Sequence, residues 1–230
     1  GLLYLHKLDD PDRAEEHFRR VRKADPTQRV MLDFYRSYYR EQNEPTKILA
    51  LLDTAQRLEK DADQRLAIAR EMASVAETDV GNLDKAIDIW KGTLRLAPGD
   101  EEASAALKRL YRETHPPKWN ALRELLKDEI DGLGDDAVEA KIALLEEVVE
   151  IYAEHLKLDV MVVNTYNAIL DLQPDHAPSL LALTERYEQM GRWNDLISVL
   201  NRRKEVESAA KGKIELLHRV VALWLDKFGN

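Results

Sequence analysis

The chain has 230 residues, no cysteine, and 34 Lys and Arg against 43 Asp and Glu, which gives a formal net charge of −9. Without cysteine it has no disulfide, no thiolate zinc site and no cysteine nucleophile. An acidic chain is also poorly suited to neutralising nucleic-acid phosphates, and no apolar run reaches the roughly 18 residues that cross a bilayer. Leu, Ala, Glu, Lys and Arg prevail over β-branched residues, which favours helices.

Apolar residues recur at spacings of three and four along most of the chain, which predicts amphipathic helices. No segment alternates with period two, so no strand is expected. Residues 1–8 have the pattern of the end of a helix. Twelve further helices are predicted at 11–24, 28–42, 46–59, 62–78, 83–96, 101–113, 118–130, 137–155, 159–172, 177–190, 193–206 and 211–227.

Three prolines mark an internal repeat. Pro26, Pro98 and Pro174 are separated by 72 and 76 residues. Eight residues before these prolines stand the aromatic residues Phe18, Trp90 and Tyr166. Twelve residues before them stand Ala14, Ala86 and Val162. Thirteen residues after them stand Tyr39, Tyr111 and Tyr187. A fourth column holds Ala76, Tyr152 and Trp224. Eleven residues before it, a fifth column holds the basic residues Arg65, Lys141 and Lys213. The sequence therefore predicts one repeat domain over 1–230, with superrepeats at about 9–80, 81–156 and 157–230.

Within this superrepeat, shorter motifs resemble those of a known family. Ala86, Trp90 and Pro98 resemble the second helix of a tetratricopeptide repeat (TPR), and Leu183, Thr184 and Tyr187 resemble its first helix. Full motifs are placed near 27–60, 64–98, 99–132, 141–174 and 175–208. The chain departs from the pattern where Glu150 stands in the small-residue column.

This resemblance implies an all-α fold of the α-solenoid class, in which antiparallel helix pairs stack into a right-handed superhelix. The segments KLDVMVVNTYNAIL and GRWNDLI also resemble long multi-TPR proteins of gliding deltaproteobacteria. The apolar last helix, with Leu217, Val221 and Trp224, lacks the polar face of a terminal repeat. A fragment of a longer array is therefore expected, and pairing of this end with another chain is the alternative.

Catalytic and metal sites are not indicated. The six histidines have no helical ligand spacing and no HExxH motif, so neither a metal nor a cofactor is expected. The acidic stretch 128–136 lacks the carboxylate spacing of a calcium loop, and no serine has a recognisable triad. The basic run 19–23 lies among acids, which favours ion pairs within the helix. The interpretation is a non-enzyme.

A dense aromatic cluster lies at 34–39. Tyr35 and Tyr39 occupy packing columns, whereas Phe34 and Tyr38 lie on an adjacent face. Core packing is the first interpretation of the cluster. An exposed aromatic anchor for a peptide is the alternative, because aromatic residues are enriched in interface hot spots.

The resemblance implies that the first helix of each motif lines a concave groove. The inner positions carried over from the family are Asp33, Ser37, Arg40, Arg70, Ser74, Glu77, Arg109, Arg112, Glu113, Glu146, Glu150, Glu154, Glu185, Glu188 and His218, with Asp226 in the same helix as the last. Arginines prevail in the first part and glutamates in the second. Residues 1–115 have a net charge of −2 and residues 116–230 one of −7. The lysines and asparagines of a chaperone-tail clamp are missing.

The sequence thus predicts a non-catalytic scaffold that binds another protein, as an extended or helical segment, in a charge-polarised groove. A structural spacer without a ligand is one alternative, and a half-a-TPR scaffold in RNA processing is another. Nucleic-acid partners and membrane insertion are not expected, while end-to-end self-association stays open. The lack of cysteine suits the cytoplasm.

Overall fold

The computed structural model describes residues 1–229, apart from the side chains of Leu5 and His6; Asn230 lies outside the described residues. Every regular element between residues 1 and 229 is helical. The helices form two compact units, one from Gly1 to Lys118 and one from Trp119 onward. The single repeat domain stays a prediction, and the boundary between the units falls within the motif predicted at 99–132.

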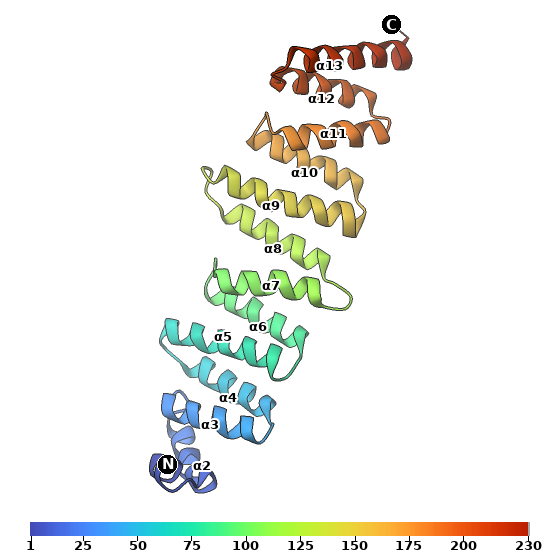
Figure 1. Ribbon diagram of the computed structural model, residues 1–230. Helices are drawn as coiled ribbons and strands as arrows, with labels where there is room; N and C mark the ends of the chain where they lie inside the picture. Colours follow the sequence, from blue (N-terminus) through green and yellow to red (C-terminus); the bar gives the residue numbers. More distant parts are fainter. Residues whose placement is uncertain (230) are drawn as a thin grey trace. The chain divides into compact units, whose positions relative to one another are not determined.

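The first unit is a succession of helices that each pack on the next (Figure 1). Short turns make neighbouring helices antiparallel. The helices are α1 (Leu2–Lys7), α2 (Pro11–Ala24), α3 (Arg29–Glu41), α4 (Pro45–Leu58), α5 (Ala62–Thr78), α6 (Leu83–Leu96) and α7 (Glu101–Glu113).

The second unit repeats this arrangement, again with each helix packed on the next. Its elements are α8 (Trp119–Gly132), α9 (Val138–Glu150), η1 (Ile151–Leu156), α10 (Asp159–Leu172), α11 (Ala177–Gln189), α12 (Trp193–Val206), α13 (Ala210–Leu223) and η2 (Trp224–Phe228). The predicted all-α fold of stacked helix pairs, the α-solenoid class, is confirmed. The helices η1 and η2 are π-helical, and the apolar spacing did not predict this.

Polar side chains fix where several helices begin. The carboxylates of Asp10, Asp61 and Asp100 accept backbone N–H groups at 3.0, 2.9 and 2.8 Å, and the side chain of Asn82 does the same at 2.9 Å. Each of these bonds satisfies one of the free N–H groups of the first turn. The helix starts are therefore encoded locally, which explains why most predicted boundaries agree with the structure within one or two residues.

The repeat columns form the interior. Ala14, Ala86 and Val162 are fully buried, and so are nearly all of Phe18 and Trp90. A small residue lets neighbouring helices approach closely, and the aromatic residue one turn later fills the space beside it. The predicted packing role is confirmed for these five residues, whereas Tyr166, the third aromatic residue, is half-buried and packs against the apolar cluster of the second unit.

The turn after every fourth helix, counted from α1, repeats in backbone conformation. Asp9, Gly81, Lys157 and Gly229 all have positive φ, at 49°, 67°, 54° and 69°, and their spacings of 72, 76 and 72 residues continue those of the prolines. Glycine adopts this left-handed conformation without steric cost, whereas a side chain with a Cβ atom does not. Glycine occupies this position twice, and Asp9 is of a residue type that tolerates the conformation through its short polar side chain. Lys157 is therefore its most strained member.

Replacing Lys157 by glycine is expected to raise the free energy of unfolding by about 1 kcal/mol, because the relief of left-handed strain exceeds the added chain entropy. Lys157→Ala is the control, since it removes the exposed contact with Glu154 but keeps the strain. The reverse change, Gly81→Lys, has open space around the new Cβ atom and is expected to cost about the same amount. Urea unfolding followed by circular dichroism measures all three. Equal stability of Lys157→Gly and Lys157→Ala would contradict the explanation.

Candidate functional site

The predicted groove residues lie on α3, α5, α7, α9–η1, α11 and α13, and none of them is buried. Arg70 and Glu77 are partly exposed, and the others are exposed. A shared concave surface for all of them stays a prediction. The partners of these side chains differ between the two units.

In the first unit, Arg40, Arg70 and Arg109 are each paired with an acid at another helix, whereas Arg112 donates to the carbonyl oxygen of Lys108 within α7. Arg40 Nε lies 3.2 Å from Asp79 Oδ2. Arg109 lies 2.7 Å from Glu77 and 3.0 Å from Glu113. These ion pairs join α3 to the end of α5, and α5 to α7. The arginines therefore connect helices side by side and do not form a free basic surface.

Arg70, in the middle of α5, has the same role. Its guanidinium pairs with Asp100, and its Nε lies 3.1 Å from Glu102 Oε2. Asp100 is buried and caps α7. Burial by itself would raise the pKa of Asp100, but the backbone N–H of Ala103 and the Arg70 guanidinium hold that pKa below its ordinary value. Arg70 thus stabilises the start of α7.

A further pair of this kind, which was not predicted from the sequence, joins α3 to α5 through Arg36 and Glu71. Burial raises the pKa of Glu71 above its ordinary value, against the opposing effect of Arg36. The pair borders a hollow of about 340 Å³ between α3 and α5, over Leu32 and Ile68. The signal in the sequence was the spacing of four between Arg36 and Arg40, which places them on one face of a helix.

In the second unit, the predicted acidic residues are paired less closely. Glu146, Glu150 and Glu154 follow one another at spacings of four along α9–η1, and Glu185 lies on α11. Glu146 has the ring of His176 at 3.9 Å, and Glu154 has Lys157 at 3.5 Å. Within the described residues, Glu150 and Glu185 form no ion pair. We call Glu146, Glu150, Glu154 and Glu185 the acidic stripe.

The other predicted positions of the second unit differ from the stripe. Glu188 on α11 is neutralised by Arg219 of α13, at 2.6 Å. His218 is exposed on α13. The ion pair between Glu188 and Arg219 again joins the first helices of successive pairs, as in the first unit.

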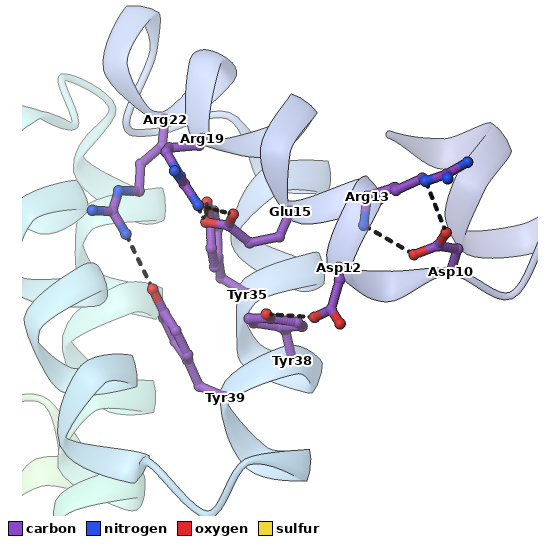
Figure 2. A network of polar contacts seen from close by, with 9 residues as sticks. All are labelled: Asp10, Asp12, Arg13, Glu15, Arg19, Arg22, Tyr35, Tyr38 and Tyr39. Atoms are coloured by element: carbon purple, nitrogen blue, oxygen red, sulfur yellow. Dashed lines mark hydrogen bonds and ion pairs between the residues drawn. The ribbon is translucent and has the colours of Figure 1, made fainter.

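The aromatic cluster of α3 connects α3 to α2 (Figure 2). The hydroxyl of Tyr35 donates to Glu15 at 2.9 Å, that of Tyr38 donates to Asp12 at 3.0 Å, and that of Tyr39 accepts from Arg22 at 3.2 Å. Three tyrosines thereby tie α3 to charged side chains of α2, as Figure 2 shows from close by.

Burial in this cluster leaves little surface for a partner. Phe34 and Tyr35 are 4% and 0% exposed, so the alternative of an exposed aromatic anchor at Phe34 is wrong. Burial and the carboxylate of Glu15 raise the pKa of Tyr35 well above its ordinary value. The Arg19 guanidinium in turn lowers the pKa of Glu15. The basic run 19–23 is thus engaged partly within its own helix, as its acidic neighbours predicted.

No group of three or more histidine, aspartate or glutamate side chains within the described part of the chain is placed to hold a metal ion. His176 shares a short hydrogen bond of 2.8 Å with Ser179, and the loop 131–136 is largely exposed. Over residues 1–229, no helix has both the length and the apolar character that a bilayer-spanning helix needs.

Comparisons with known proteins give similarity to solved TPR structures. No family model matches the sequence, and no curated protein matches it. The chain is similar to MamA (18% identity, 74% of this chain and 98% of that one, TM-score 0.37) and to YrrB, a TPR protein with an unusual peptide-binding site (12%, 87% and 97%, 0.37). It is also similar to the TPR domain of P58(IPK) (13%, 96% and 63%, 0.38). At identities of 12% to 18%, these similarities concern the fold alone.

Proposed function

We propose that the chain is a non-catalytic protein–protein interaction scaffold, and that the acidic stripe of α9–η1 and α11 binds a lysine- or arginine-rich segment of another protein. The observation that carries this proposal is the difference in pairing between the units. Glu150 and Glu185 are exposed and form no ion pair within the described residues, whereas Arg40, Arg70 and Arg109 of the first unit are each paired with acids.

The spacing of the acidic stripe supports a linear partner. Residues four apart on a helix face the same side, about 6 Å from one another. Three such carboxylates can meet successive cations of an extended or helical segment. The negative potential of the second half of the chain, with its net charge of −7, would also speed the encounter with a basic partner.

The proposed binding surface is smaller than the polarised groove predicted from the sequence, because it leaves out the arginines of the first unit. A partner that bound Arg40 or Arg109 would have to displace carboxylates that lie 3.2 and 2.7 Å from their guanidinium groups. One that bound Arg70 would have to displace Asp100. Breaking such pairs would also weaken the contacts between neighbouring helices. We therefore assign the electrostatic attraction of a partner to the acidic stripe alone.

The test is capture of proteins from a lysate of the source organism by the whole chain and by Glu146→Lys with Glu150→Lys and Glu185→Lys. We expect a specific partner to be retained by the original chain and lost from this variant, and to be released by salt between about 0.1 and 0.5 M because exposed charges are screened. The matched control is Asp128→Lys with Asp131→Lys and Asp136→Lys. It makes the same change of net charge at exposed positions in and near the loop after α8.

Partner retention by the stripe variant, or equal loss from both variants, would contradict the acidic stripe as the binding surface. Circular dichroism and thermal unfolding must first show that both variants are folded. If no protein is retained by the original chain, the spacer alternative is favoured instead.

A further inference from the structure

The contact between α9 and α11 repeats a contact of the first unit with its charges exchanged. Between α5 and α7, Arg70 pairs with Asp100, the residue that caps α7. The counterparts of these two residues lie 76 positions further along the chain, which is the offset of the repeat. Glu146 stands in the place of Arg70, and His176 stands in the place of Asp100 at the start of α11. A glutamate has thus replaced the arginine, and a histidine has replaced the aspartate.

This exchange makes one of the two contacts depend on pH. Arginine and aspartate are both charged throughout the neutral range, whereas histidine is the side chain whose charge ordinarily changes between about pH 5 and 8. Arg70 also meets a second acid, Glu102, but the counterpart of Glu102 is Pro178. The pair of the first unit is therefore permanent, whereas Glu146 has a charged partner only when the imidazole of His176 carries a proton.

The geometry of His176 suits this dependence on charge. Its Nε2 lies 3.9 Å from Oε1 of Glu146, which is too long for a hydrogen bond, so the attraction requires a charged ring. Its Nδ1 lies 2.8 Å from Oγ of the buried Ser179, and this contact holds the ring with Nε2 near Glu146. The side chains of His176 and Glu146 are 14% and 52% exposed. A largely covered ring thus stands beside a carboxylate that a partner can reach.

The other charged groups around His176 have opposing effects. Within the described residues, Glu146 is the one acid paired with the ring. Asp175 precedes it in the turn, and Arg202 of α12 donates to a carbonyl of the same turn at 3.3 Å. On α10, burial raises the pKa of Tyr166, and the charge of Glu146 adds to this rise. The positive end of the α11 dipole opposes a charge on the ring, so the charged form of the ring depends on Glu146.

We propose that His176 competes with the partner for Glu146. Protonated His176 pairs with Glu146 and repels a cation of the partner, whereas neutral His176 leaves Glu146 to that cation. The acidic stripe therefore binds a basic segment more tightly at about pH 8 than at about pH 5.5. This regulation rests on the proposed function of the acidic stripe, whereas the pair itself is a property of the chain alone.

The pair is tested by NMR of the histidine rings of the intact chain between about pH 5 and 9 at about 0.1 M salt. We expect Glu146→Gln to move the midpoint of the His176 titration to lower pH by about 0.3 to 0.6, because a partly exposed carboxylate favours the charged ring about two- to fourfold. The matched control is Glu154→Gln. It removes a charge of the same stripe about 12 Å further along the helix, beyond the screening length, so the midpoint is expected to stay within about 0.1. Equal midpoints in Glu146→Gln and the original chain would overturn the proposal.

The regulation is tested with a fluorescently labelled peptide of three lysines alternating with serine. When the peptide is extended, its lysines lie about 7 Å apart, close to the spacing of the stripe. Fluorescence anisotropy is expected to show binding at least about threefold weaker at pH 5.5 than at pH 8. His176→Asn keeps a residue suited to the start of a helix but has no charge, so its affinities at the two pH values are expected to agree within about twofold. His115→Asn changes an exposed histidine of the first unit and is expected to keep the pH dependence.

The regulation and the proposed function fail in different ways. Equal binding at the two pH values, or an unchanged pH dependence in His176→Asn, would overturn the competition by His176 and leave the acidic stripe as a binding surface. Absence of binding at both pH values would overturn the regulation and contradict the proposed function as well.

Discussion

Replacing Trp90 by alanine is expected to lower the free energy of unfolding of the first unit by about 3–5 kcal/mol, because a large buried side chain is lost and a cavity is left. Trp90 is 4% exposed and stands one turn after the fully buried Ala86. In a stack where each helix pair contacts its neighbours, this loss weakens the packing on both sides of α6. Hydrogen exchange of α5, α6 and α7 measures it locally, as faster exchange in all three helices.

Two controls distinguish the packing of Trp90 from other effects. Leu96→Ala truncates an apolar residue of the same helix that is 42% exposed, and its expected cost is below about 1 kcal/mol. Trp90→Phe places in α6 the residue that Phe18 supplies in α2. It also removes the indole Nε1, a buried donor without a hydrogen-bond partner, which offsets part of the lost volume. If Trp90→Ala costs no more than Leu96→Ala, the packing role of the column is wrong.

The fold was predictable because its signals are local and repeated. Helix starts depend on caps such as Asp61 and Asn82, which act within three residues. The interior depends on columns such as Ala86 with Trp90, whose periodicity can be counted in the sequence. The π-helical ends at Ile151–Leu156 and Trp224–Phe228 were not predictable in this way. A single widened turn keeps the same residue types and changes only which carbonyl accepts each N–H group.

The candidate site was predicted less well, because it depends on which charges meet across helices. Arg70 and Glu150 both stand at positions that the resemblance to the TPR motif predicts to line the groove. Arg70 is partly exposed and Glu150 is exposed. Arg70 is nevertheless paired with Asp100, thirty residues away, whereas Glu150 has no ion pair within the described residues. Such long-range pairs carry no local pattern. The sequence indicated the positions, whereas the structure shows which of these charges join helices and which form no ion pair within the described residues.

Replacing Asp100 by alanine is expected to cost about 2–3 kcal/mol, more than the loss of an ordinary helix cap. The change removes the bond to the backbone N–H of Ala103, and it also leaves the Arg70 guanidinium without its buried partner. The matched control is Asp61→Ala. Asp61 caps α5 with a bond of 2.9 Å but is exposed, so its loss is expected to cost about 1 kcal/mol. Urea unfolding at pH 7 measures the difference between the two variants.

The pH dependence of stability separates the two contributions of Asp100. Because its pKa is lowered in the folded state, its charge stabilises the fold above its unfolded pKa of about 3.9, and this contribution is lost as pH falls through the lower folded pKa. Asp100→Asn keeps a capping oxygen but has no charge. Its stability is expected to decline less steeply than that of the original chain below about pH 4. Parallel curves for the two would show that the charge of Asp100, and its pair with Arg70, contributes no electrostatic stability.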